Sequence, residues 1–318
     1  MNKDQLLRFY EQGYRDFTGV NLCGEDLSGV MLIAVNLTGA NLVGANLSRA
    51  FLTKSILNGA ILNWANLSFA KMSEVRLEQA DLTKANLSGA FMVKSHLADA
   101  KLSGANLSYT NLRASNLERA NVAGAKLQKV NLRQANLQKT NLKWADLKEG
   151  RLSGATLTDV SLAGVNLSQT FLIDVDLSGI DLTGINLSQA KLTRANLSNT
   201  NLCEANLSEA QLRNANLNCA NLSKANLAEA QLKGGNLCNA NLTRANLINA
   251  DLREACLKQA DLSNANLTET DLSDADLEYA VLFNTILETS YSNSASLPGS
   301  QLDVDTNADY SMHQVQIA

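Results

Sequence analysis

A large apolar residue recurs at every fifth position from Phe17 to Leu287, without an inserted or deleted residue. We call this residue position i; from Leu22 onward it is always Leu except at Met72, Met92 and Val122. Position i−2 is small, usually Ala, and position i−1 is usually Asn or Asp, as in the block 105–109, Ala-Asn-Leu-Ser-Tyr. A period of five fits neither the α-helix nor the β-strand, and an unbroken internal repeat is typical of a solenoid.

Four such blocks per turn would place residues twenty apart directly above one another. Positions i and i−2 then point inward, and the other three positions point to solvent. Alternating large and small inward residues fill a narrow interior without voids. Gly and Asn at position i+2, as at Gly19 and Asn199, indicate corners with positive φ. The absence of Pro before Pro298 indicates that the blocks use their backbone N–H groups.

These features resemble the pentapeptide-repeat family over residues 15–289. The resemblance implies an all-β fold, a right-handed quadrilateral β-helix of about 14 coils at four blocks per coil. The segment Leu6–Tyr10 followed by Gly13–Phe17 is also similar to the leader of cyanobacterial members, one of which regulates heterocyst differentiation.

We expect three segments: an N-terminal helical cap at 1–14, the β-helix at 15–289, and a partial C-terminal cap with a mobile acidic tail at 290–318. Asn2 can cap a short helix whose residues Leu6, Phe9 and Tyr10 form an apolar stripe, and Gly13 suits its end. The stripe would cover the first coil, because bare solenoid ends invite polymerisation. Residues 290–318 contain no Lys or Arg.

The net charge of −4 is too small to indicate a strongly charged partner, but the charge is unevenly distributed. Residues 101–151 have a net charge of +7 and residues 251–318 one of −10. Five cysteines, at 23, 203, 219, 238 and 256, show no metal-ligand spacing, and no two of the last four share a column. We expect free thiols in a reducing compartment. Met1–Tyr10 lacks the apolar core of a signal peptide, so we expect a cytoplasmic protein.

The candidate chemistry does not indicate an enzyme. His96 occupies an outward position and His313 the tail, and no nucleophile is placed beside either. The carboxylates of Asp271, Asp274 and Asp276 would lie on the outside, without the burial that tunes an acid and a base. Glycines at five-residue spacing are corner residues rather than a phosphate loop. We predict no catalytic residue, no cofactor and no metal site.

Outward apolar residues that replace Asn, Asp or another polar residue are the candidate protein-interaction site. They are Met31, Phe51, Ile56, Ile61, Trp64, Phe69, Phe91, Val93 and Phe171. Four of them, at 31, 51, 91 and 171, share one column, with Lys54, Lys71 and Lys94 interspersed; those from 51 to 69 ring a single coil. Exposed apolar residues beside Lys favour a protein-binding patch. The alternative is that they pack across coils and only stabilise the fold.

We therefore predict a non-catalytic protein–protein interaction scaffold or regulatory adaptor, monomeric and not membrane-bound, that binds a protein along one face of a rigid rod. The family resemblance implies an alternative, a DNA mimic that protects or inhibits a type II topoisomerase. That role would call for acidic columns along the whole rod, whereas strong acidity is confined to the C-terminal part. Direct nucleic-acid binding through pairs such as Arg113 and Arg133 is not favoured, because few aromatic residues accompany them.

Overall fold

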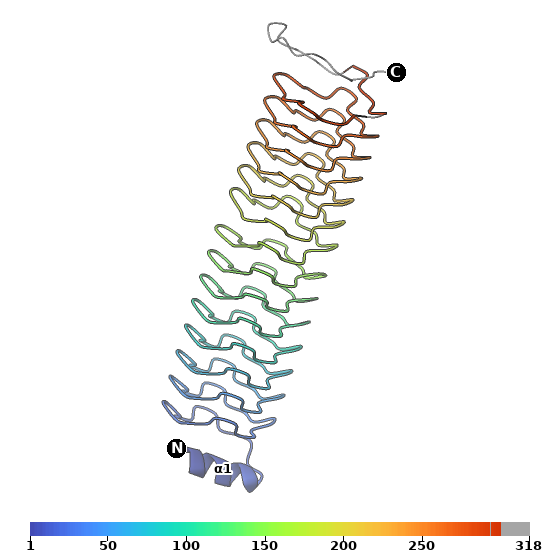
Figure 1. Cartoon of the computed structure of the whole chain (residues 1–318). Coiled ribbons are helices and arrows are strands. Elements are labelled where there is room, and N and C mark those ends of the chain that lie inside the picture. The colour runs from blue at the N-terminus through green and yellow to red at the C-terminus, as the bar shows by residue number, and fades with distance from the viewer. Residues whose placement is uncertain (293, 300–318) are drawn as a thin grey trace. The chain divides into compact units, whose positions relative to one another are not determined.

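The computed structural model describes residues 1–292 and 294–299, in two compact units: unit 1 is Met1–Asn166, and unit 2 begins at Leu167. In each unit, residues twenty apart pair as parallel bridges, for example Asn46 with Asn66 and Asn206 with Asn226 (Figure 1). The predicted twenty-residue register is confirmed within each unit. We name the four sides of a coil A, B, C and D; they contain residues 31–34, 36–39, 41–44 and 46–49, respectively, and the residues at multiples of twenty from these.

The inward positions form the core. In the block 105–109, Ala105 and Leu107 are fully buried, and Met72, Met92 and Val122 are buried in the same way as Leu. Full burial of one Leu side chain contributes about 1.5–3 kcal/mol. The prediction of which positions face inward is confirmed.

A block with Asn or Asp at position i−1 can bond all five of its backbone N–H groups. In the block 105–109, Ala105 donates to Leu102 O at 3.0 Å, Asn106 to Ala85 O at 2.9 Å, Leu107 to Lys126 O at 2.7 Å, Ser108 to Asn106 Oδ1 at 3.1 Å and Tyr109 to Gln128 O at 2.9 Å. Four donors thus use the main chain of the same or an adjacent coil. The fifth, at position i+1, uses the side chain at position i−1.

This side-chain acceptor explains why position i−1 is Asn or Asp. The carboxylate serves as well as the amide: the hydroxyl of Thr183 and its N–H both donate to Asp181, which lowers the pKa of that carboxyl. The amide groups also bond along the stack on side D, where Asn66 Nδ2 donates to Asn46 Oδ1 at 3.1 Å and Asn86 Nδ2 to Asn66 Oδ1 at 3.3 Å. The Asn column on side D thus links successive coils through side-chain hydrogen bonds.

The sides are much shorter than ordinary strands. Each side contributes one bridged residue, and among residues 1–292 and 294–299 no strand extends beyond it. The cause is the corner at every position i+2, where φ is positive, as at Arg49 (58°) and Tyr109 (61°). For residues other than Gly this conformation costs roughly 1–2 kcal/mol. The all-β prediction therefore holds for the pairing between coils, but not as extended strands.

Aromatic corner residues lie over the next coil of the stack. The Phe69 ring covers Gly89, where an added Cβ would come within 2.6 Å of a ring carbon. Trp144 covers Gly164 in the same way. A glycine at the next corner therefore makes room for the ring.

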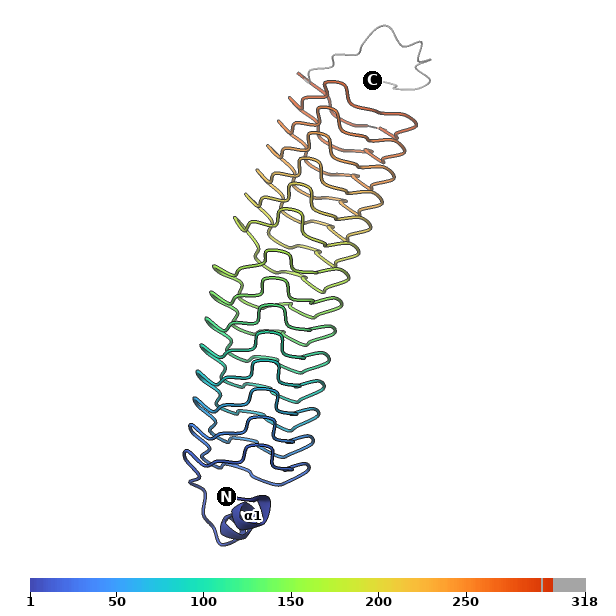
Figure 2. The same cartoon turned by 90° about the vertical axis from the view of Figure 1, so that its left-hand side faces the viewer.

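The only helix in the described part of the chain is α1, Lys3–Glu11, which lies at the open end of the first coil (Figure 2). The Asn2 side chain accepts from Gln5 N, and the Gln5 side chain accepts from Asn2 N, so the predicted N-cap is confirmed. Leu6 is buried, whereas Phe9 is exposed and packs edge-on against Tyr14, with 5.5 Å between the ring centroids. Only part of the predicted apolar stripe thus faces the coil. The predicted tail at 303–318 lies outside the described residues.

Two residues that break the repeat are explained by contacts with this N-terminal helix. Glu25 occupies an i−2 position, which is usually small, and its Oε2 accepts from Lys3 N at 3.0 Å. A carboxylate at the N-terminus of a helix is favoured by the free N–H groups there. Met31 leaves Ile33 N–H without an Asn oxygen, and the Tyr10 hydroxyl accepts that N–H at 3.2 Å instead. Both exceptions in the first coils therefore provide a hydrogen bond between helix α1 and the coil beside it.

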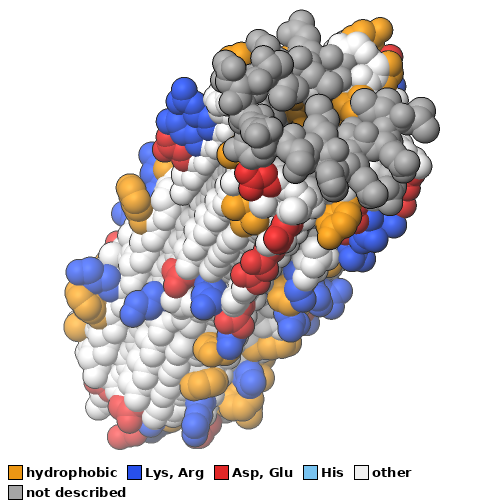
Figure 3. All heavy atoms as spheres, turned by 45° about the horizontal axis from the view of Figure 1, so that its top comes forward, with side chains coloured by type: hydrophobic (Ala, Val, Ile, Leu, Met, Phe, Trp, Pro, Cys, Tyr) orange, Lys and Arg blue, Asp and Glu red, His pale blue; other side chains and the backbone are white. Residues whose placement is uncertain are grey.

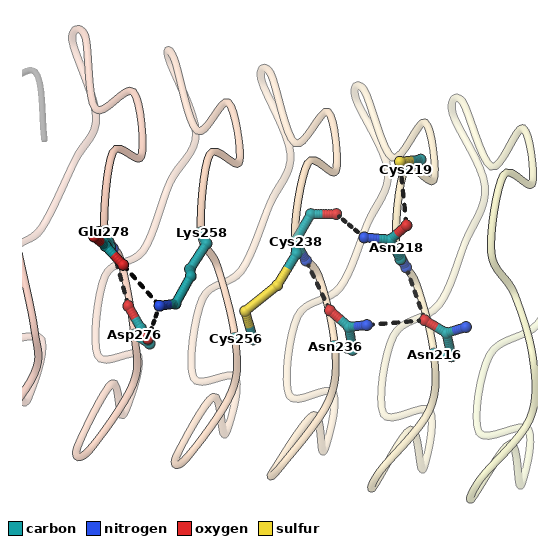
Figure 4. The surroundings of a disulfide bond; sticks show 9 residues. All are labelled: Asn216, Asn218, Cys219, Asn236, Cys238, Cys256, Lys258, Asp276 and Glu278. Atoms are coloured by element: carbon teal, nitrogen blue, oxygen red, sulfur yellow. Dashed lines mark hydrogen bonds and ion pairs between the residues drawn. A yellow bond between two sulfur atoms is a disulfide. The ribbon is translucent and has the colours of Figure 1, made fainter.

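The prediction of five free thiols is wrong for Cys238 and Cys256, which form a disulfide in unit 2 (Figure 4). The two residues are 18 apart, at position i+1 of one block and position i−1 of the block above it on side B. Side chains in these two positions are neighbours elsewhere: Asn63 Nδ2 donates to Asp81 at 2.8 Å, and Gln128 Nε2 donates to Asp146. A search for cysteines in one column misses this diagonal pair.

The contact between Phe69 and Gly89 can be tested with a matched glycine. Gly89→Ala and Gly124→Ala introduce the same methyl group at corners of similar φ, 65° and 64°, but an added Cβ at Gly124 meets nothing within 4 Å. We expect Gly89→Ala to lose about 1 kcal/mol more, because the Phe69 ring must move. Urea unfolding measures the difference. Equal losses, or a difference that persists in a Phe69→Ala background, would contradict the account.

The Tyr10 contact can be tested by restoring the usual acceptor. Tyr10→Phe should lower the free energy of unfolding by about 1 kcal/mol, because Ile33 N–H loses its partner. Met31→Asn should recover most of that loss in the Tyr10→Phe background and contribute less on its own. Additive effects in this double-mutant cycle, read from urea unfolding, would show that the two acceptors serve different groups.

The disulfide predicts a redox-dependent stability. Reduction should destabilise unit 2 by up to about 3 kcal/mol, since the bond closes a short loop in the unfolded chain. We expect dithiothreitol to lower the melting temperature of the wild type but not of Cys238→Ser/Cys256→Ser. When the free thiols are blocked with an alkylating reagent in the source cells, mass spectrometry should count three blocked cysteines. Five blocked cysteines would instead support the reducing compartment that the sequence predicts.

Candidate protein-interaction surface

Side A of unit 1 brings together four of the predicted site residues: Met31, Phe51, Phe91 and Val93. Met31, Phe51, Lys71 and Phe91 follow one another as bridged neighbours in successive coils, and Ile33 and Val93 lie two residues after the two ends of this column. Met31, Phe51 and Phe91 are exposed, at 57%, 40% and 41%, and Val93 is half-buried. We call Met31, Ile33, Phe51, Lys71, Phe91 and Val93 the side-A patch.

The other candidates of unit 1 lie on the remaining sides. Ile56 is on side B, Ile61 and Trp64 are on side C, and Phe69 is on side D. They do ring the coil that contains Phe51. Because they point in different directions, they add no area to the side-A patch.

Two of these exposed residues contact the next coil, which gives them a structural role. The Trp64 ring lies 4.5 Å from Lys84 Nζ in the next coil, and Phe69 covers Gly89. A cation over an aromatic ring contributes about 0.5–1 kcal/mol at an exposed site. These contacts support the structural interpretation for Trp64 and Phe69.

Phe171 belongs to unit 2, where it is half-buried. Lys191 Nζ lies 4.2 Å from the centroid of its ring. The next side-A residues of unit 2 at position i−1, Gln211 and Gln231, are polar. Within unit 2, Phe171 is thus not part of an apolar column like that of unit 1.

The charged groups of the side-A patch are mainly basic. Lys54, Lys71 and Lys94 form no ion pair in the described part of the chain, and the nearest acid on the same side is Glu74. Lys71 Nζ lies 5.9 Å from the Phe91 ring centroid. Some basic groups on the other sides are paired with acids, as where Arg119 binds Asp99 at 2.8 Å. The side-A cations thus remain available to a partner.

Sequence reasoning missed the main-chain donors of this surface. Positions i−1 at Phe51, Lys71 and Phe91 offer no oxygen, so the N–H groups of Thr53, Ser73 and Val93 have no acceptor within residues 1–292 and 294–299. Three successive blocks of one column without Asn or Asp were the signal that could have revealed them. The patch combines apolar contact area, cations and free donors, which suits binding rather than bond-breaking chemistry.

Apolar and charged side chains are scattered over the molecular surface. In Figure 3, hydrophobic (orange), Lys or Arg (blue) and Asp or Glu (red) side chains lie among white atoms of the backbone and of other side chains. In the described residues, no group of three or more His, Cys, Asp or Glu side chains is placed to hold a metal ion. No described helix is long and apolar enough to cross a bilayer. His96 is exposed on side B, and His313 lies outside the described residues.

The comparisons with known proteins agree with this architecture. Overlapping copies of the model for pentapeptide repeats match residues 16–282. HetL from the cyanobacterium Nostoc sp. strain PCC 7120, a pentapeptide repeat protein involved in heterocyst differentiation regulation, is 30% identical; the match covers 85% of this chain and 96% of HetL, with a TM-score of 0.24. A search of proteins with curated descriptions returned no match.

Two further solved structures are similar to the chain over shorter stretches. A pentapeptide repeat protein from the thylakoid lumen of Arabidopsis thaliana is 34% identical over 31% of this chain and 68% of its own, with a TM-score of 0.30. QnrB1, a plasmid-mediated fluoroquinolone resistance protein, is 19% identical over 54% of this chain and 90% of its own, with a TM-score of 0.31. On the match over residues 16–282, the chain belongs to the pentapeptide-repeat family, whose members fold as right-handed quadrilateral β-helices.

Proposed function

We propose that this chain is a non-catalytic scaffold or regulatory adaptor that binds a protein partner along side A of unit 1. Family members are generally structural or regulatory proteins rather than enzymes. The observation that carries the proposal is the column of Met31, Phe51, Lys71 and Phe91, exposed in successive coils. Exposed apolar residues that gather on one surface are typical of protein-binding sites.

The apolar column works against the stability of the fold. An Asn at position 51 or 91 would accept the N–H of Thr53 or Val93, as Asn46 accepts from Ser48 at 3.2 Å. Such a bond contributes about 1 kcal/mol. Positions that depart from a local rule without a structural gain are the expected places for function.

The coil also fixes the positions of the binding residues. The blocks of Phe51, Lys71 and Phe91 are each held by bonds to both neighbouring coils, as where Phe51 N donates to Val30 O and Leu52 N donates to Lys71 O, both at 2.8 Å. Within the patch, residues twenty apart pair in register. Side chains of one column are therefore spaced at about 4.8 Å, the usual distance between neighbouring strands. A surface that is already ordered loses less entropy when a partner binds.

The DNA-mimic alternative has less support. It needs uncompensated negative charge, but several acidic side chains of unit 2 are paired with bases. Asp174 binds Arg194 at 2.7 Å, and Lys258 binds both Asp276 and Glu278 (Figure 4). The basic groups of side A in unit 1 also oppose a DNA-like surface.

The proposal predicts that partner capture depends on the side-A column. Phe51→Asp/Phe91→Asp introduces an acceptor oxygen at position i−1, so the coil should remain as stable as the wild type or become more stable. Proteins retained from an extract of the source cells should be lost from this variant. Quantitative mass spectrometry of the retained proteins measures the loss, and the melting temperature reports the fold.

Asn111→Asp/Asn131→Asp is the matched control, because it introduces the same two charges farther along the same column. The control should retain the partners of the wild type. Identical sets of retained proteins for the wild type and Phe51→Asp/Phe91→Asp would refute binding through side A.

A further inference from the structure

We propose that the side-A patch binds an acidic polypeptide segment that also carries apolar side chains, with oxygen atoms of that segment accepting the free N–H groups of Thr53, Ser73 and Val93. This inference rests on the proposed function, because it names the chemical class of the partner. Three features of the patch support it independently: its donors, its charge and its apolar residues.

The free donors form an uninterrupted run of three coils. On the N-terminal side of the run, Ile33 N–H is bonded to the Tyr10 hydroxyl. On the C-terminal side, Arg113 N–H is bonded to Asn111 Oδ1 at 3.2 Å. Between these two, the N–H groups of Thr53, Ser73 and Val93 have no acceptor in the described part of the chain.

These donors face the outside of the coil. The equivalent N–H groups in other blocks reach a side-chain oxygen at position i−1, and that side chain points away from the core. The same direction at Thr53, Ser73 and Val93 leads to the surface beside Phe51, Lys71 and Phe91. At a coil spacing of about 4.8 Å, the three donors span about 10 Å. A polypeptide with several oxygen acceptors can reach all three.

The charge of the surface selects an acidic occupant. Within residues 31–34, 51–54, 71–74 and 91–94, the charged residues are Lys54, Lys71, Lys94 and Glu74, which leaves a net charge of +2. Arg113 and Arg133 continue the basic character along the same side. Hydrogen bonds from N–H groups to carboxylates are about twice as strong as those between neutral groups.

The apolar residues distinguish a polypeptide from a nucleic acid. Met31, Ile33 and Phe51 lie at one end of the patch, and Phe91 and Val93 at the other, with Lys71 between them. Phosphate backbones are bound mainly by dense Lys and Arg, with aromatic residues that stack on the bases. Aliphatic side chains beside the two Phe rings match a partner with apolar side chains of its own.

A displayed library of random twelve-residue peptides tests the class of ligand. Peptides are selected on the full-length wild-type chain and counter-selected on Phe51→Asn/Lys71→Asn/Phe91→Asn. This variant carries the residue typical of the family at each position, so it should fold at least as stably as the wild type. We expect the enriched peptides to combine Asp or Glu with aromatic or aliphatic residues. Enrichment of neutral or basic peptides, or no peptide that distinguishes the two chains, would overturn the proposal.

A pair of substitutions at one position isolates the role of the N–H groups. Lys71→Asn and Lys71→Gln remove the same charge, but only Asn is expected to accept Ser73 N–H. In unit 2, Gln211 and Gln231 at position i−1 accept no N–H from Arg213 or Lys233 within the described residues. For an enriched acidic peptide, measured by fluorescence anisotropy, we expect Lys71→Asn to bind about fivefold more weakly than Lys71→Gln, the equivalent of about 1 kcal/mol.

Equal affinities of the two Lys71 variants would show that Ser73 N–H does not meet the peptide. Tighter binding of a single-stranded oligonucleotide than of the acidic peptide would likewise overturn the inference in favour of nucleic acid. The extract experiment separates this inference from the proposed function. If side A retains a partner whose binding segment is basic, the scaffold stands and the inference fails; if side A retains no protein, the scaffold fails.

Discussion

Every five-residue block has five backbone N–H groups, and an Asn or Asp side chain at position i−1 supplies the acceptor for the N–H at position i+1. In the block 105–109, four N–H groups bond to main-chain carbonyls, while Ser108 N–H bonds to Asn106. An unmade hydrogen bond at a partly buried site costs about 1 kcal/mol or more. This constraint explains both the prevalence of Asn and Asp at position i−1 and the absence of Pro from the repeat.

The same constraint gives meaning to the exceptions. At Met31 the cap helix α1 supplies the acceptor through Tyr10, so the loss of Asn is compensated. At Phe51, Lys71 and Phe91 no described group replaces it, and these three positions follow one another in one column. A surface with apolar residues, unpaired cations and free donors is what a partner with matching groups would require.

Much of this architecture could be predicted from the sequence, because a period of five without insertions leaves little freedom in the register. The inward direction of Leu107 and the positive φ at Tyr109 follow from that period. Neighbours across the diagonal do not, since they depend on how far a side chain leans. The Cys238–Cys256 disulfide is such a contact. For the candidate site, the shared column of apolar residues was predictable from the register. The free N–H groups were not, because they are recognised only when the hydrogen bonds of other blocks show that the side chain at position i−1 is the usual acceptor.

Amide hydrogen exchange, resolved residue by residue by NMR, tests the central constraint most directly. Position i+1 amides that follow Asn or Asp, such as those of Ser48, Ser68 and Ser88, should be protected. The amides of Thr53, Ser73 and Val93 should exchange much faster, although they belong to coils of equal stability. Equal protection of the two groups would contradict the account, because the side chain at position i−1 would then not determine whether the N–H at position i+1 is hydrogen-bonded.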